Sequence, residues 1–373
     1  MATNSLRPPV TGTGVYVREL VTAFLAEPRI NRVYGLRDGR VHRIDRVPAA
    51  EQPGAAGGHA LPRRVGRKAR RAWHQVAGRY ALRWLAPTVY HEPTYLPVRY
   101  PGPTVVTIHD LSHWHYPAYH PASRVIALNR GLPKAVERAA AVITVSEYVA
   151  DEVRRSFDVA PERVHTVYNG VSPVFRPRAA SATRPTLAAY GLEPGGYILS
   201  VATLEPRKNL QRLMAAYEAL PAAIQDRYPL VLTGAAGWRN GGIHERLRRL
   251  LARRRARQLG YVPDADLPML YAGAAAFAYP ALYEGFGLPP LEAMASGIPT
   301  LTANTSALPE VVGEAAVTVD PHDTAAISQG LQRLIEDGAL RQRLRRAGPQ
   351  RAAGFSWRRA AAQTVDIYER VRP

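Results

Sequence analysis

Short apolar runs rich in β-branched residues recur along the chain and constrain its fold more than any other feature. Runs of this kind lack the polar alternation of a half-exposed strand and are typical of strands buried on both faces of a parallel sheet. They occupy residues 104–108, 142–145, 197–202 and 230–233. Helical patterns lie at residues 133–141, 147–156, 210–220 and 243–258. The alternation of strands with helices predicts an α/β protein built from βαβ units.

One interruption in this alternation divides the chain. Residues 171–185 are rich in Pro, Ser, Ala and Arg, and a new strand pattern begins at Tyr197. We therefore expect two Rossmann-like parallel-sheet domains, at residues 1–172 and 175–350, and a last segment at residues 351–373 that contains a helix. Because ligands of open α/β sheets bind outside the carboxyl ends of the strands, we expect the two domains to face each other across a ligand-binding cleft.

The composition is that of a globular and strongly basic protein. Of 373 residues, 46% are hydrophobic, and 49 Lys and Arg against 30 Asp and Glu give a formal net charge of +19. No cysteine is present, which excludes disulfides, thiolate metal sites and thiol nucleophiles. We recognise no signal peptide and no apolar stretch near the roughly 18–20 residues that span a bilayer. These features predict a cytoplasmic location.

The segment from residue 283 to 297 has the pattern of a strand end, a loop and a helix. Gly285 and Gly287 allow the backbone to approach a ligand closely, and the N–H groups at the start of the helix favour an anion. Two carboxylates, Glu284 and Glu292, are placed to face the same pocket, where Glu292 suits hydrogen bonds from vicinal hydroxyls. The alternative is a capped helix with a solvated glutamate.

A second cluster, at residues 203–209, also follows a predicted strand and precedes a predicted helix. Its Arg207 and Lys208 therefore lie where phosphates bind in α/β proteins. Arginine supplies a planar fork and lysine a point charge, which together suit a diphosphate that gains negative charge as its bond to carbon breaks. In so basic a chain, the alternative is a solvated surface pair.

The two clusters resemble the motifs of the retaining GT-B glycosyltransferases of family 4, the group 1 enzymes, which include many bacterial mannosyltransferases. The resemblance covers most of the chain and implies that Glu284 contacts the donor sugar and Glu292 the ribose of the nucleotide. It implies that Arg207 and Lys208 hold the diphosphate. It also implies an acceptor-binding N-terminal domain, a donor-binding C-terminal domain and a last helix that crosses back to the first domain. Further donor contacts are implied at Gly285, Phe286, Gly287 and Leu288.

Two features of the first half fit the same resemblance. His109 follows the strand at residues 104–108 and matches a family histidine that faces the donor sugar. A histidine there can hydrogen-bond sugar hydroxyls or shield a cation-like transition state, and a buried structural histidine is the alternative. Gly12 and Gly14 match a glycine-rich loop between the first strand and the first helix, which approaches the phosphates or the acceptor. The first strand itself is reduced to residues 2–6.

The resemblance implies that a hexose moves from a nucleotide-diphosphate sugar to a saccharide or lipid-linked saccharide acceptor. The expected setting is bacterial surface glycan synthesis, and the expected outcome is retention of anomeric configuration. Catalytic roles then fall to Glu284, His109, Arg207 and Lys208. GDP-mannose is the favoured donor, and no cofactor is expected besides this co-substrate.

Two groups of side chains raise the question of a metal. The histidines and aspartate at residues 109–115 lack the helical ligand spacing of a metal site. Asp264 and Asp266 resemble a cation-binding Asp-x-Asp, but they directly precede the predicted helix at residues 267–272, and we expect them to cap it. The sequence therefore predicts a reaction without a metal.

A basic segment suggests a partner surface. Residues 63–83 carry eight Lys or Arg and no acid, and Trp73, Tyr80 and Trp84 are interleaved with them or follow them. The segment is a candidate interfacial helix on an anionic membrane that carries a lipid-linked acceptor. A basic nucleic-acid-binding protein is the rival from another class, but it leaves the glutamate pair without a role, so no nucleic acid is expected. A nucleotide-sugar 2-epimerase of related architecture is a second enzyme alternative.

Overall fold

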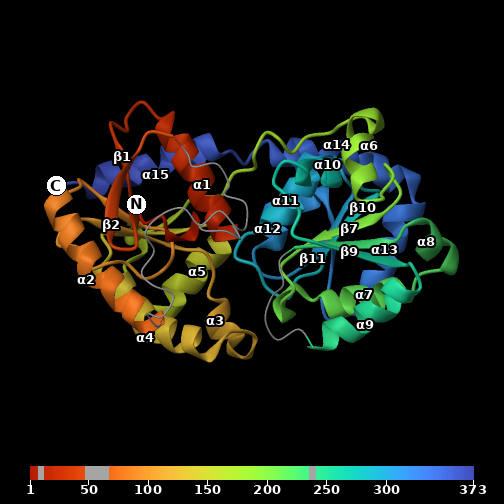
Figure 1. Cartoon of the computed structure of the whole chain (residues 1–373), viewed down its shortest axis with the longest axis horizontal. Coiled ribbons are helices and arrows are strands. Elements are labelled where there is room, and N and C mark those ends of the chain that lie inside the picture. The colour runs from red at the N-terminus through yellow and green to blue at the C-terminus, as the bar shows by residue number, and fades with distance from the viewer. Residues whose placement is uncertain (7–11, 47–66, 235–240) are drawn as a thin grey trace. The chain divides into compact units, whose positions relative to one another are not determined.

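In the computed structural model, which describes residues 1–6, 12–46, 67–234 and 241–373, the chain folds into two compact units (Figure 1). Unit 1 consists of Met1–Leu111, Ser123–Gly170 and Trp357–Pro373. Unit 2 consists of Ser112–Ala122 and Val171–Ser356. Each unit contains a parallel sheet with helices packed against it, so the α/β class is confirmed.

The parallel sheet of unit 1 has the strand order β3-β4-β5-β6. Its strands are β3 (Tyr90–Glu92), β4 (Thr104–Ile108), β5 (Ala141–Thr144) and β6 (Val164–Thr166). Every residue of β3, β4 and β5 is buried, as the uninterrupted apolar runs predict for strands covered on both faces. The carboxyl end of β4 leads directly to His109.

The start of the chain joins an antiparallel hairpin to this sheet. The hairpin consists of β1 (Val33–Arg37) and β2 (Arg40–Ile44). Ala2 forms a parallel bridge with Leu36 of β1, and its N–H donates a hydrogen bond to the carbonyl of His91 in β3 at 3.0 Å. A 3-10 turn at Asn4–Leu6 follows. The short first strand expected at residues 2–6 is therefore limited to this single bridge.

Helices pack against the sheet of unit 1, and two of them come from opposite ends of the chain. They are α1 (Gly12–Leu25), α2 (Arg67–Leu85), α4 (Ala122–Arg138), α5 (Glu147–Ser156) and α15 (Trp357–Val371). The last helix, α15, lies beside α1 (Figure 1). Tyr16, Leu20 and Phe24 recur every four residues along α1 and are all buried, which is the spacing of one helix face.

The parallel sheet of unit 2 has the strand order β12-β11-β10-β7-β8-β9. Its strands are β7 (Ile198–Val201), β8 (Leu230–Thr233), β9 (Ala256–Gly260), β10 (Ala276–Tyr279), β11 (Thr300–Ala303) and β12 (Val317–Val319). The chain starts in the middle at β7, adds β8 and β9 on one side, and then adds β10, β11 and β12 on the other. This is a doubly wound sheet, with its reversal of direction between β7 and β10.

Helices cover both faces of the unit 2 sheet (Figure 1). On one face α7 (Leu210–Glu218) packs against α9 (Gly241–Ala252) and α13 (Thr324–Glu336). On the other, α11 (Leu288–Ala295) packs against α14 (Gly338–Ala352), and α10 (Leu267–Ala272) packs against α6 (Ala180–Ala189). Shorter helices are α3 (Ser112–His115), α8 (Ala222–Arg227) and α12 (Leu308–Val312). The core of unit 2 is the apolar interior between these layers.

Two sequence predictions of local structure are wrong. The helix predicted at residues 243–258 ends at Ala252, and β9 follows it. Because β9 is an edge strand whose Arg257 and Gln258 are exposed, it lacks the apolar run by which the buried strands are recognised. The helix predicted at residues 133–141 begins eleven residues earlier as α4 and contains Pro133 in its interior, although proline normally starts a helix.

Candidate active site

The reversal of strand order in unit 2 brings the two predicted clusters to one edge of the sheet. β7 and β10 are parallel neighbours, so their carboxyl ends lie side by side, at the position where doubly wound sheets bind their ligands. The turn after β7, a 3-10 turn at Pro206–Lys208, carries Arg207 and Lys208. The loop after β10 carries Glu284. Their side chains meet in one network of hydrogen bonds.

Three side chains donate to the same carboxylate oxygen of Glu284, Oε1. Arg207 Nη1 donates at 3.1 Å and Tyr279 Oη at 3.0 Å, and Lys208 Nζ also donates. The backbone N–H of Glu284 donates to Ser306 Oγ at 3.0 Å. Burial by itself would raise the pKa of Glu284, but the positive charges of Arg207 and Lys208 outweigh burial and lower that pKa below its usual range. Glu284 is therefore an ionised carboxylate held in a fixed position.

The guanidinium of Arg207 is directed into the protein, and the residue is only 8% exposed. Its Nη1 also donates to the carbonyl oxygen of Tyr283 at 2.6 Å, and its Nη2 donates to Glu205 Oε1 at 2.9 Å. The planar fork of arginine thus spans two carboxylates, Glu205 and Glu284, which a lysine could not do.

Lys208 completes the network. Its Nζ donates to Tyr279 Oη at 2.8 Å and lies 3.8 Å from Glu205 Oε1. Burial raises the pKa of Tyr279 well above its usual value, and the charge of Glu284 raises it further, so its hydroxyl remains a neutral donor. We call these five residues, Glu205, Arg207, Lys208, Tyr279 and Glu284, the switch-point cluster. With two cations and two carboxylates its formal net charge is zero.

Sequence reasoning assigned no role to three residues of this region. Glu205 lies inside the predicted cluster at residues 203–209, and Tyr279 is the last residue of the apolar run before the glycine loop, so position alone could have drawn attention to both. Asn209 adopts a left-handed conformation with φ 58°, and its Nδ2 donates to the carbonyls of Pro280 and Pro321 at 2.9 and 2.7 Å. Asn209 therefore ties the loop after β7 to the loops after β10 and β12.

The glycine loop and the start of α11 lie next to the cluster in sequence. Gly285 and Phe286 are buried, and the ring of Phe286 packs edge-on against Phe355 at 5.8 Å. Gly287 has φ 105°, and a Cβ there would lie 2.7 Å from a methyl carbon of Leu308, so a side chain is excluded on both grounds. Leu288 begins α11 and is half-buried.

The helix start offers an anion fewer donors than a typical helix. The first three positions of α11 are Leu288, Pro289 and Pro290. Because proline has no backbone N–H, only Leu288 carries one at these positions. The expected anion site at this helix therefore depends on side-chain cations more than on the backbone.

Glu292 lies one turn into α11 and is half-buried. It faces Tyr271 of α10, whose pKa is raised well above its usual value, first by burial and then by the negative charge of Glu292. The two predicted carboxylates thus have different surroundings. Glu284 is surrounded by cations, whereas Glu292 is next to a neutral hydroxyl.

His109 in unit 1 is held in one tautomer. Its Nε2 lies 2.7 Å from the carbonyl oxygen of Pro93, and since a carbonyl can only accept, Nε2 carries the proton. Burial lowers the pKa of His109, so the ring is neutral and Nδ1 presents a lone pair. The rings of Tyr16 and Tyr95 pack against it in edge geometry, with centroids 4.8 and 6.0 Å away. His109 is therefore an oriented hydrogen-bond acceptor.

Gly12 and Gly14 lie in the first turn of α1, not in a loop before it. A Cβ at Gly12 would meet no atom within 4 Å, so this position is open, whereas Gly14 is buried. Residues 7–11, including the threonine that opens the predicted motif, lie outside the described residues.

Within residues 1–6, 12–46, 67–234 and 241–373, no group of three or more His, Asp or Glu side chains is arranged to hold a metal ion. Asp266 stands at the N-cap of α10, but its side chain does not cap the helix. Its Oδ2 instead accepts a hydrogen bond from Tyr190 Oη at 2.6 Å. The expectation that Asp266 caps this helix is therefore wrong, because Tyr190, which directly follows α6, binds the carboxylate instead.

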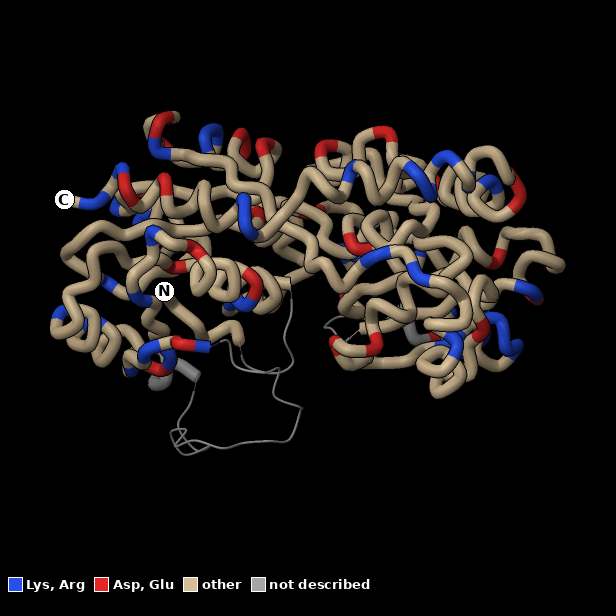
Figure 2. Tube along the Cα trace, turned by 90° about the horizontal axis from the view of Figure 1, so that it is seen from above, with Lys and Arg blue, Asp and Glu red and all other residues tan. Residues whose placement is uncertain are grey.

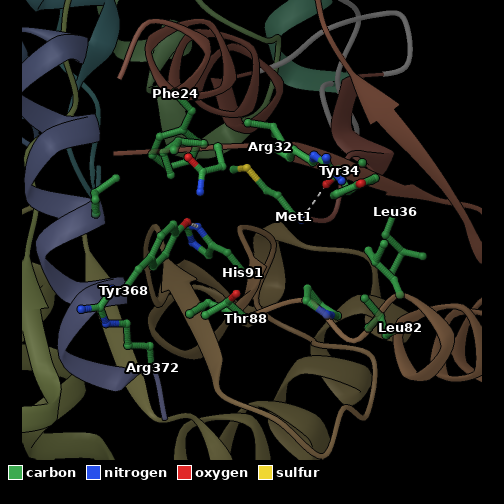
Figure 3. Close-up of a pocket in the computed structure, with 18 of the residues that line it drawn as sticks. Met1, Phe24, Arg32, Tyr34, Leu36, Leu82, Thr88, His91, Tyr368 and Arg372 are labelled. Atoms are coloured by element: carbon green, nitrogen blue, oxygen red, sulfur yellow. Dashed lines mark hydrogen bonds between the residues drawn. The ribbon is translucent and has the colours of Figure 1, made fainter. Parts of the chain in front are cut away.

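Unit 1 also contains a cavity of about 740 Å³ (Figure 3). It lies next to Met1, at the amino ends of β1 and β3, and its lining includes Arg32, Tyr34, His91 and Tyr368. His109 follows the carboxyl end of β4, whereas the cavity lies at the amino end of β3, the parallel neighbour of β4. The cavity therefore belongs to a different region of unit 1 from the predicted site residue.

Two further observations concern the surface. Among the helices that the structure describes, none combines the length and hydrophobicity needed to cross a membrane. Lys and Arg are interspersed with Asp and Glu along the described trace of both units (Figure 2).

Comparisons with known proteins cover the whole chain. Residues 10–175 match the family model of Glycosyltransferase Family 4, and residues 189–351 match that of Glycosyl transferases group 1. The O-antigen chain mannosyltransferase B of Escherichia coli is 37% identical over 99% of this chain and 98% of its own. Among solved structures, sucrose-phosphate synthase of Thermosynechococcus elongatus has a TM-score of 0.75 at 19% identity, over 99% of this chain and 97% of that one. Anabaena HepE, solved in complex with UDP-glucose, has a TM-score of 0.62 at 19% identity, over 79% and 76%.

Proposed function

The chain belongs to glycosyltransferase family 4, the group 1 enzymes of GT-B fold, and we propose that it transfers a hexose from a nucleotide-diphosphate sugar to a saccharide acceptor. The family expected from the sequence motifs is thereby confirmed. The observation that carries the proposal is the switch-point cluster, because buried cations stand where a doubly wound sheet binds its ligand. Membership of the family supplies the reaction class.

The proposed reaction exchanges one bond at the anomeric carbon for another. The bond from this carbon to the diphosphate breaks, and the acceptor oxygen forms its bond on the same face, so that configuration is retained. The acceptor hydroxyl gives its proton to the departing phosphate oxygen, so no enzyme nucleophile and no metal take part. We assign Lys208 to the developing charge of the diphosphate.

The other proposed contacts follow from the local geometry. Glu284 is a fixed carboxylate and accepts a sugar hydroxyl, and Glu292 accepts the hydroxyls of the ribose. His109 accepts a sugar hydroxyl through Nδ1, since its Nε2 is engaged with Pro93. Gly285 and Gly287 bring the backbone close to the donor.

Mannose is the hexose we propose, and GDP-mannose the donor. The full-length similarity to a mannosyltransferase of O-antigen chains supports mannose and a polysaccharide or lipid-linked acceptor. Several other mannosyltransferases match part of the chain, among them one from Mycolicibacterium hassiacum at 33% identity over 61% of this chain and 54% of its own. A UDP-sugar donor is the competing choice, since HepE binds UDP-glucose in a similar fold.

A thermal-shift screen tests the donor site first. The purified protein is mixed with GDP, UDP, ADP and dTDP sugars, and we expect GDP-mannose alone to raise the melting temperature. The same screen on Lys208→Ala should show no shift, while the variant melts near the temperature of the wild type. If no nucleotide sugar stabilises the folded wild type, the proposal of a donor site is wrong.

A product assay tests the reaction itself. With a mannan-type acceptor, we expect a new glycoside whose anomeric configuration, read by NMR, matches that of the donor, at a rate that EDTA does not change. Inverted product would exclude the retaining mechanism, and loss of activity in EDTA that divalent cations restore would exclude metal independence. Conversion of the donor without an acceptor would instead favour the 2-epimerase alternative.

We further propose that α2 places the enzyme on an anionic membrane surface. Trp73, Val76, Tyr80 and Trp84 recur every three or four residues along α2 and form one exposed stripe, with 50% to 86% of the surface of each residue accessible. Arg79 and Arg83 are exposed beside the stripe. Aromatic residues flanked by arginine suit the interface between lipid headgroups and acyl chains.

Vesicle sedimentation tests this surface. We expect binding to vesicles of phosphatidylglycerol, weak binding to phosphatidylcholine, and loss of binding in the double variant Tyr80→Ala/Trp84→Ala. Trp114→Ala, which removes an exposed tryptophan of α3, is the matched control and should bind like the wild type. Equal binding by both variants, or a stronger and salt-sensitive affinity for RNA or DNA than for vesicles, would contradict the membrane role.

A further inference from the structure

Arg207 contacts two carboxylates inside the protein, and this geometry separates it from Lys208. Both terminal nitrogens of its guanidinium are engaged, Nη1 with Tyr283 and Glu284 and Nη2 with Glu205. The residue is 8% exposed and Glu205 is 5% exposed. An arginine that binds a phosphate presents its fork to the ligand, whereas this fork is directed at protein groups.

Glu205 and Arg207 form a pair whose charges offset each other in a buried place. A buried cation is stable only when paired and hydrogen-bonded, and Glu205 and Glu284 both pair with Arg207, each through a different terminal nitrogen. Tyr279 supports the same oxygen of Glu284 from the end of β10. With its three side-chain donors all on Oε1, Glu284 is held at one oxygen, and Oε2 takes none of these three bonds.

We propose that Glu205 and Arg207 are positioning residues, which fix and ionise Glu284 for the reacting sugar and leave the contact with the diphosphate to Lys208. The inference rests on the proposed function and refines it. Before the donor binds, the cluster is neutral, with Arg207 and Lys208 both bound to Glu284. When the negatively charged diphosphate arrives, Lys208 can turn toward it, because Arg207 still holds Glu284. The role of Arg207 thus differs from the phosphate contact that the family resemblance implies.

The test uses Arg207→Lys, which keeps the charge but cannot bridge Glu205, Glu284 and Tyr283 together. Turnover (kcat) and the Kd for free GDP, the product nucleotide, are measured on the full chain. We expect kcat to fall about tenfold or more, while the Kd for GDP changes less than threefold. A loss of GDP affinity that matches the loss of kcat would show that Arg207 binds the phosphate, and unchanged kcat and Kd would show that it does neither.

Glu205→Gln is the second variant, and Glu193→Gln is its matched control, since Glu193 pairs with Arg184 on the exposed surface of the same unit. Loss of the Glu205 charge leaves the cluster with a net positive charge, so GDP should bind at least as tightly while kcat falls. Glu193→Gln should leave kcat and Kd unchanged. A Glu205→Gln protein that behaves like this control would overturn the proposal.

Two results keep the failure of this inference distinct from failure of the proposed function. If the wild type neither binds a nucleotide nor transfers a sugar, the proposed function is wrong and the positioning roles have no reaction to serve.

If Glu205→Gln does not fold, Glu205→Asp replaces it, because it keeps the charge and shortens the side chain by one carbon. We expect Glu205→Asp to bind GDP normally with a reduced kcat, and a full kcat in this variant together with a full kcat in Arg207→Lys would overturn the inference.

Discussion

Glu92, the last residue of β3, and Glu284, in the loop after β10, are both buried glutamates, one in each unit, and their pKa values shift in opposite directions. Glu92 accepts hydrogen bonds from Tyr90 Oη at 2.8 Å and from the N–H and hydroxyl of Thr94. Burial is the largest influence and raises the pKa of Glu92. Around Glu284, burial acts in the same direction, but Arg207 and Lys208 reverse the outcome and lower the pKa.

The comparison teaches which buried carboxylate is available for chemistry. Neutral donors satisfy Glu92 within three residues of chain, so it stabilises a local turn between β3 and the loop that follows. The donors of Glu284 come from the loop after β7 and from β10, and two of them carry charge. A site that binds a charged ligand needs ionised groups that are buried, and such groups are stable when opposite charges are paired.

The largest expected effect is on turnover, and it follows replacement of a cation beside Glu284. Lys208→Ala removes the charge that we assign to the departing diphosphate, so we expect transferase activity to fall about 100-fold or more. Lys134→Ala, on the exposed side of α4, is the matched control and should retain full activity. Steady-state kinetics with GDP-mannose measures both. Equal activity in the two variants would show that Lys208 does not stabilise the departing diphosphate.

A smaller effect, on stability, separates the two glutamates by the sign of their pH dependence. A carboxyl whose pKa is raised on folding stabilises the protein most at low pH, and this contribution is lost as the pH rises through the folded pKa. A carboxyl whose pKa is lowered stabilises the protein above its unfolded pKa, and that contribution is lost as the pH falls through the folded one. Glu92 is of the first kind and Glu284 of the second.

Urea unfolding from pH 4 to pH 8 tests this contrast with Glu92→Gln and Glu284→Gln. At neutral pH, Glu284→Gln should lose about 3 kcal/mol because it leaves Arg207 and Lys208 underpaired. This deficit should shrink as the pH falls. The free energy of unfolding of Glu92→Gln, relative to that of the wild type, should instead be most favourable at pH 8, because ionisation of the buried Glu92 then destabilises the wild type most. The same pH trend in both variants would refute the assigned pKa directions.

Local pattern was enough to predict both clusters and the buried strands β4, β5, β7 and β8. The buried strands β4 and β8 were predicted at their observed limits, because strands covered on both faces are continuously apolar. The edge strand β9 was missed, since half of its side chains face solvent and carry the polar pattern of a helix surface. Periodicity identifies what a strand buries and therefore carries no signal for a half-exposed strand such as β9.

The places of the site residues along the chain could be predicted from the sequence, but the contacts among their side chains could not. That Arg207, Lys208 and Glu284 follow strands could be inferred from the sequence, since each lies in the short segment after an apolar run. The order of the strands could not, and only the adjacency of β7 and β10 brings these residues together. For the same reason the inward direction of Arg207 and its pairing with Glu205 had no local signal, because both depend on contacts made across the sheet edge.

The smallest effect is on the two tyrosines that serve the two glutamates. Tyr90→Phe removes a donor from a carboxylate that has no cation in its hydrogen-bond set, so we expect a loss of about 1.5 kcal/mol at pH 8. Tyr279→Phe removes one of three donors to Glu284, and Arg207 and Lys208 remain, so the loss should be less than half as large. Urea unfolding of both variants at pH 8 measures the difference. The Tyr279 hydroxyl also accepts a hydrogen bond from Lys208. A larger loss of stability for Tyr279→Phe than for Tyr90→Phe would therefore mean that this hydroxyl is needed to keep the cation in place beside Glu284.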